Sequence, residues 1–182
     1  MNKKIWWKLV LSVFLFPFGL VSASHAGETT VRLHGTLAAE ACLIAPEDKS
    51  LEVDFGTIVD KALYQYQRWI SQTFTIHLIN CDVQLGSYVQ ISFKGDESTA
   101  LPGMLAVSPP EMGIAIGIET TSGQQILINR DDNSGTYVQS ISNGTSTLAF
   151  RGWVQGEPES LSDKTVQRGI FSAVATFQLE YY

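Results

Sequence analysis

Apolar and polar side chains alternate along residues 169–182, the last fourteen of the chain. Successive side chains of a β-strand point to opposite faces, so a period of two with one apolar face predicts a half-buried strand. No turn or partner strand follows it. We therefore expect an edge strand, whose apolar face invites aggregation unless something covers it. The residues expected to face inward are Gly169, Phe171, Ala173, Ala175, Phe177, Leu179 and Tyr181.

A second alternating segment lies near the other end of the chain, at residues 29–37. No hairpin turn connects it to a neighbouring strand before Cys42. An exposed strand and an uncovered edge are complementary, because a strand can add to a sheet edge through main-chain hydrogen bonds and side-chain pockets. One face of this segment carries Thr29, Val31, Leu33, Gly35 and Leu37, and the other carries Thr30, Arg32, His34 and Thr36.

Between these ends the pattern predicts short strands separated by turns. A helical turn or two is expected only within residues 58–68. Many short strands with Gly, Pro and Asn turn signals between them indicate a single all-β domain, a sandwich or a barrel. The predicted strands are residues 51–55, 73–79, 88–93, 113–119, 125–128 and 147–154.

Residues 1–26 have the pattern of a secretory signal peptide. Three lysines accompany an apolar run from Leu9 to Val21, and Ser24-His25-Ala26 forms a small-x-small cleavage site. The apolar run has 13 residues, whereas a membrane-spanning helix needs about 20. The mature chain is thus expected to begin at Gly27 and to be secreted through the periplasm.

Cleavage at this site makes the chain more acidic. The formal charge is −6, and the signal peptide removes three of the 12 basic residues and none of the 18 acidic ones, which leaves −9. Nucleic acids and anionic membranes need a basic patch on their protein partner. The charge therefore argues against both as partners.

Cys42 and Cys81 are the only cysteines. An even pair in an exported chain most simply forms one disulfide, with a metal site or free thiols as the alternatives. Their wide spacing is unsuited to zinc, and we expect no metal or cofactor. Closing a loop of this length would stabilise the fold by roughly 4 kcal/mol. The first cysteine directly follows the first strand, so the bridge is expected to tie that strand to the end of residues 73–79, unlike the bridge of an ordinary immunoglobulin domain.

Candidate catalytic residues are scarce. After cleavage the histidines are His34 and His77, both at strand positions and neither beside a Ser, Cys or Asp in a catalytic pattern. An enzyme is therefore not expected. A carbohydrate-binding protein is a stronger alternative, because Tyr64, Tyr66, Trp69 and Trp153 are aromatic side chains of the kind that stack on sugar rings.

Three motifs resemble the subunits of chaperone–usher pili. These are Val31-x-Leu33-x-Gly35-x-Leu37-x4-Cys42, the strand ending Leu78-Ile-Asn-Cys81, and the final Ala175-Thr-Phe-Gln-Leu-Glu-Tyr-Tyr182. Gly169 and Tyr181 occupy the places of a family glycine fourteenth from the C-terminus and a penultimate tyrosine. The middle of the chain, for example Ile91-Ser-Phe-Lys-Gly95, is similar to the tip adaptor subunits of P pili and to type 1 minor pilins.

This resemblance implies an incomplete immunoglobulin-like β-sandwich that lacks its last strand. Residues 27–38 would be the donor-strand extension and residues 39–182 the pilin domain. A periplasmic chaperone would first fill the groove beside residues 171–181. At the outer-membrane usher the extension of the next subunit would replace it, with neither an enzyme nor an external energy carrier.

The resemblance thus implies a structural minor subunit of adaptor type, on the cell surface, in a fimbrium that supports adhesion. A carbohydrate-binding fimbrial adhesin is the first alternative, although adhesins of this family normally add a lectin domain for which the mature chain has no room. A major rod subunit or an assembly terminator of the same pilus is the second alternative.

Overall fold

The computed structural model describes residue 32, residues 39–69 and residues 72–182. Residues 38–182 form one compact unit. The predicted signal peptide, and the predicted donor-strand extension apart from Arg32, lie outside the described residues.

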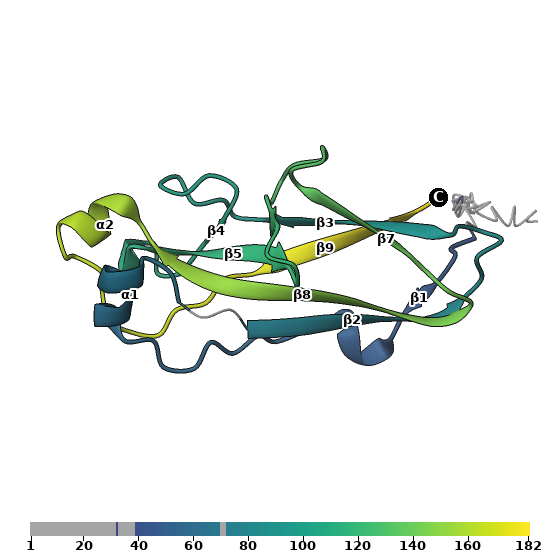
Figure 1. Ribbon diagram of the computed structural model, residues 1–182, viewed down its shortest axis with the longest axis horizontal. Coiled ribbons are helices and arrows are strands. Elements are labelled where there is room, and N and C mark those ends of the chain that lie inside the picture. Colours follow the sequence, from purple (N-terminus) through teal and green to yellow (C-terminus); the bar gives the residue numbers. More distant parts are fainter. Residues whose placement is uncertain (1–31, 33–38, 70–71) are drawn as a thin grey trace, which may run out of the picture. The chain divides into compact units, whose positions relative to one another are not determined.

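Two antiparallel sheets make up the unit, which confirms the all-β prediction (Figure 1). The first sheet has the order β1 (Leu43–Ile44), β2 (Gln72–Cys81), β8 (Gly144–Gly156), β5 (Ile114–Thr120) and β4 (Leu105–Ala106), and β6 (Gln125–Ile126) pairs with β5. The second has the order β7 (Thr136–Ser140), β3 (Tyr88–Gly95) and β9 (Ala175–Tyr181). Short helical elements are η1 (Pro46–Lys49), α1 (Asp60–Tyr66), η2 (Pro110–Met112) and α2 (Pro158–Ser162).

Inward-facing side chains of both sheets form the core around Phe150, which is fully buried. Its ring lies 5.4 Å from that of Phe93 and 5.8 Å from those of Phe74 and Tyr137, measured between ring centroids. Two of these contacts are edge-to-face, the arrangement that aromatic quadrupoles favour. Alternation along β2, β3 and β8 thus places one apolar face of each strand between the sheets.

The outer face of the first sheet is covered at Trp153, whose side chain is 4% exposed. The Arg68 guanidinium lies 3.9 Å from the centroid of this ring. A Cβ atom on Gly117 would come within 2.4 Å of the indole, so only glycine allows the ring to lie flat on β5. Glu119 is buried beside them, 2.6 Å from Arg68 and 3.1 Å from Arg151. This cover explains why every residue of β5 is buried.

Cys42 and Cys81 form a disulfide, as predicted. Cys42 precedes β1 and Cys81 is the last residue of β2, and these two strands pair in register Leu43 opposite Ile79. The bridge therefore holds the start of the folded unit to the end of β2.

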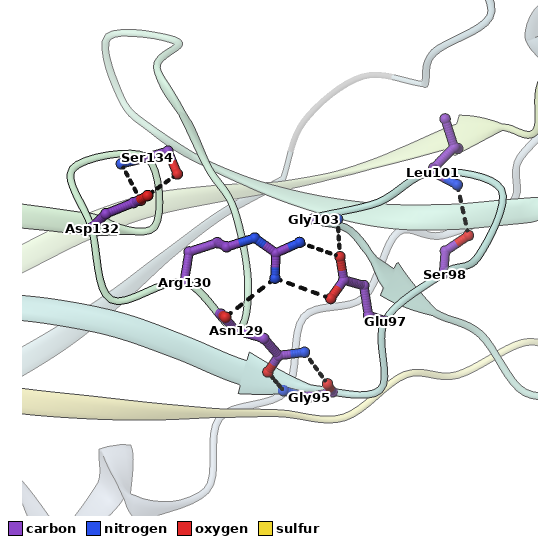
Figure 2. Close-up of polar contacts among 9 residues, drawn as sticks. All are labelled: Gly95, Glu97, Ser98, Leu101, Gly103, Asn129, Arg130, Asp132 and Ser134. Carbon is purple, nitrogen blue, oxygen red and sulfur yellow. Dashed lines mark hydrogen bonds and ion pairs between the residues drawn. The ribbon is translucent and has the colours of Figure 1, made fainter.

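A polar cluster anchors the loops beyond β3 (Figure 2). The Glu97 carboxylate accepts hydrogen bonds from the Gly103 N–H at 2.6 Å and from Arg130 at 2.9 Å, and these bonds lower its pKa. The Asn129 side chain accepts from the Gly95 N–H and donates to the Gly95 carbonyl. Because Gly95 pairs with Ala175, the cluster also fixes where β9 begins.

Three strand predictions are wrong in extent. The strand predicted at residues 125–128 covers only β6, Gln125–Ile126. The other two differ more. Residues 51–55 belong to no strand, and residues 169–174 lie outside β9, with one isolated bridge between Ser172 and Ser108. Alternation sets which side chains face inward, but a strand also needs a neighbour for its backbone hydrogen bonds. Both segments border an open groove instead.

Candidate functional site: an open apolar groove

A cavity of about 1100 Å³ opens along the folded unit. Residues 49–60 form its first wall and residues 166–177 form its second wall. The floor is apolar and comes from both sheets; among its residues are Phe74, Phe93, Leu105, Met112, Ile114, Ile116 and Ile118. Side chains of the core therefore form the groove floor, and all of those named except Phe74 are 2–8% exposed.

The first wall runs beside the groove without a β-ladder. Within the part of the chain that the structure describes, no backbone hydrogen bond joins residues 51–58 to another segment. The Gly56 N–H donates to the nearby Asp54 carboxylate at 2.7 Å. Backbone N–H and C=O groups are obligatory hydrogen-bonding groups. An extended chain laid along this wall would provide partners for them.

The second wall includes the start of β9. Among the described strands β9 pairs only with β3, and Ala175 and Phe177 border the cavity. Of the seven residues predicted to face inward, Phe171, Ala173, Phe177, Leu179 and Tyr181 are partly buried against the core, whereas Gly169 and Ala175 are exposed. Leu179 and Tyr181 lie beyond the cavity lining, and the other five predicted residues belong to it.

The two walls approach one another at Phe55 and Phe171, whose ring centroids lie 6.4 Å apart. Phe55 also packs over β8, because a Cβ atom on Gly152 would lie 3.1 Å from its ring. Both phenylalanines line the cavity. Their rings therefore come close to one another across the cavity.

An ion pair joins the walls at Asp60 and Arg168. Nε and Nη2 of Arg168 donate to one carboxylate oxygen of Asp60 at 3.0 and 2.6 Å. The pair lowers the pKa of Asp60 and raises that of Arg168. The second wall is further held by the Gln167 N–H, which donates to the Met112 carbonyl at 3.1 Å. The sequence pattern did not single out Asp60 or Arg168, because charged side chains of these types are common on protein surfaces.

The aromatic side chains proposed for sugar stacking are divided between core and surface. Trp69 is partly buried against the core, and Trp153 lies under Arg68. Tyr64 is partly buried, while Tyr66 is 66% exposed on α1. Neither tryptophan offers an open ring face of the kind that a sugar platform requires.

His77 has a structural contact. Its Nδ1 lies 2.8 Å from Oδ2 of Asp48, which also accepts the His77 backbone N–H. Asp48 is 4% exposed and belongs to η1. The interaction fastens η1 to β2. His34 lies outside the described residues.

Among the described residues, none of the helices has the length and apolar character needed to cross a membrane.

Comparison with known proteins finds similar sequences along nearly the whole chain. The model of the fimbrial protein family matches residues 31–182. The chain is 31% identical to the Fimbria A protein of Serratia marcescens over 177 residues, which cover 96% of this chain and 97% of that protein. It is 30% identical to the fimbrial adapter PapK of Escherichia coli over 170 residues, which cover 92% and 96%.

Solved structures share the fold. The P pilus rod subunit PapA superposes with a TM-score of 0.67 at 21% identity, over 79% of this chain and all of that one. A subunit in a chaperone–usher pilus structure superposes with a TM-score of 0.66 at 23% identity, over 86% and 97%.

Proposed function

The chain belongs to the fimbrial protein family, the subunits of chaperone–usher pili, and on this premise we propose that it is an adaptor-type minor subunit that polymerises by donor-strand exchange. Its β-sandwich is the incomplete immunoglobulin-like fold of pilins. Pilins are structural proteins rather than enzymes, and they are exported through the periplasm and assembled into surface fimbriae. What we propose beyond family membership is the adaptor role of this chain, its binding partners and its support of adhesion.

The observation that carries this proposal is the groove with an unpaired wall. A strand inserted between residues 51–58 and β9 would bond to backbone groups on both sides. Every second side chain of that strand would enter the apolar cavity. One insertion would therefore complete the ladder and cover the apolar groove floor at the same time.

The donor strand in this proposal is the extension at residues 27–38, with Thr29, Val31, Leu33, Gly35 and Leu37 facing the acceptor groove. Burying Val31, Leu33 and Leu37 would contribute roughly 5 to 9 kcal/mol before the cost of ordering the strand. Each new ladder hydrogen bond would add about 1 kcal/mol. The chaperone fills this chain's own groove first, against residues 169–181, until the next subunit's extension replaces it at the usher.

Amide hydrogen exchange tests the groove directly. In purified fibres the amides of residues 51–58 should be protected by orders of magnitude, because the inserted strand supplies their hydrogen-bond partners. The amides of the exposed turn residues Thr121 and Ser122 should exchange quickly in the same sample and provide the internal control. Fast exchange of residues 51–58 in intact fibres would show that no strand pairs with this wall.

Similarity to the fimbrial adapter PapK supports the adaptor role. An adaptor joins two different parts of a fibre, so we expect about one copy of this chain for each fibre. Quantitative mass spectrometry of purified fibres, with labelled peptides as standards, measures this ratio. Hundreds of copies in each fibre would assign the chain to the rod instead.

A further inference from the structure

The proposed donor strand is joined to the folded unit by very little chain. Leu37 is the last residue of the donor face, and Ala41 is 1% exposed within the folded unit. Four residues of fully extended chain span at most about 14 Å. If residues 29–37 insert into another subunit, as the proposed function requires, that acceptor subunit must lie against the end of this unit where Ala41 is held.

Ala41 is held where the turn between β2 and β3 meets the end of β9. Its carbonyl accepts the Asp82 N–H at 2.7 Å. A Cβ atom on Gly86 would lie 3.5 Å from the Ala41 Cβ and 3.1 Å from the Tyr181 Cβ. Burial raises the pKa of Tyr181, and the neighbouring Glu40 carboxylate raises it further. Figure 1 shows the C-terminus at this end, far from α1.

Large apolar side chains of the described residues are exposed at this end. Leu85 is 53% exposed, Tyr88 is 47% exposed and Tyr182 is 58% exposed. The rings of Tyr88 and Tyr182 stack with centroids 6.1 Å apart and planes 19° apart. Backbone hydrogen bonds of 3.0 and 3.1 Å join the same two residues, and the Leu85 N–H donates to Asp82 within the turn. The surface is therefore preorganised as well as apolar.

We propose that Leu85, Tyr88 and Tyr182 form a docking surface for the subunit that accepts this chain's extension. Tyrosine is enriched at protein interfaces, where its ring buries apolar area at a small entropic cost. The exposed carboxylates of Glu40, Asp82 and Glu180 belong to the same end of the unit. The complementary surface of the acceptor is therefore apolar and surrounded by basic groups. The contact adds to the donor strand and sets the angle between the two subunits.

Site-specific photo-crosslinking in assembled fibres tests this contact. A benzoylphenylalanine is placed, in separate full-length chains, at Leu85, at Thr30 and at Tyr66, and the crosslinked partners are identified by mass spectrometry. Thr30 belongs to the predicted outward face of the extension and reports donor-strand insertion. Tyr66 is a control, because α1 lies at the opposite end of the unit (Figure 1). We expect positions 30 and 85 to crosslink to the same subunit and position 66 not to reach it.

The outcomes separate this inference from the proposed function. A crosslink from position 30 without one from position 85 to the same subunit overturns the docking surface and leaves donor-strand exchange standing. A crosslink from position 85 to the chaperone alone overturns it as well. No crosslink from position 30 to any acceptor overturns both proposals.

A pair of substitutions measures the energetic effect. Leu85→Asp should make the chain dissociate from fibres several-fold faster in denaturant, whereas Leu85→Met should leave the rate unchanged. Equal dissociation rates for the Asp variant and the unmodified chain would overturn the proposal.

Discussion

A chain that lacks residues 178–182 should fail to accumulate in the periplasm. The deletion removes four of the seven residue pairs between β3 and β9, including those of Leu179 and Tyr181. Each lost ladder bond costs about 1 kcal/mol, and loss of the two partly buried side chains adds to this. The total is comparable to the 5–15 kcal/mol that stabilises a typical domain. The deletion also removes the edge that the chaperone would pair with.

Immunoblotting of periplasmic extracts measures the accumulation. The matched control changes only the exposed face of the same strand, through Gln178→Ser together with Glu180→Gln. This variant keeps the backbone ladder and the inward face, so its amount should equal that of the unmodified chain. Recovery of the truncated chain as a soluble monomer would contradict an incomplete fold that depends on capture at β9.

The second large effect is expected at Gly35 in the proposed donor strand. Gly35→Tyr should slow insertion into the acceptor groove more than about tenfold, because forcing extra atoms into a packed site costs 1–3 kcal/mol or more. The groove of this chain illustrates the restriction, since the aromatic rings of Phe55 and Phe171 come within 6.4 Å of one another there, measured between centroids. A related acceptor is expected to have a similar one. Glycine is poor strand material, and a close backbone approach accounts for its place there.

The measurement is strand exchange in vitro between a peptide of residues 27–38 and a chaperone-bound acceptor subunit. Thr36→Tyr provides the control, because it adds the same ring on the opposite, outward face of the peptide. We expect near-normal exchange for Thr36→Tyr and little for Gly35→Tyr. In the full chain, Gly35→Tyr should leave chaperone binding intact, since residue 35 precedes the folded unit. Exchange of the Gly35→Tyr peptide at the unmodified rate would exclude this segment as the donor.

The strands of the core could be predicted because their side chains alternate regularly. Ile76 and Leu78 in β2, Ile91 and Phe93 in β3, and Phe150 in β8 are buried where the pattern predicts. β7 was missed, since its residues are only partly buried or exposed and show little contrast between faces. The disulfide was also predictable, because an exported chain with two cysteines offers a single pairing.

The tertiary structure decided which segments have backbone partners. Residues 51–55 and 169–174 alternate as strands do, yet they form the open walls of a groove. Alternation is a local property that is visible along the chain, whereas a ladder depends on what lies alongside. The contacts between these walls are non-local: Phe55 meets Phe171, and Asp60 meets Arg168 across 108 positions of sequence. The sequence by itself therefore determined the inward faces and the disulfide, and only the fold brought together, over the apolar groove floor, two walls that share no β-ladder with one another.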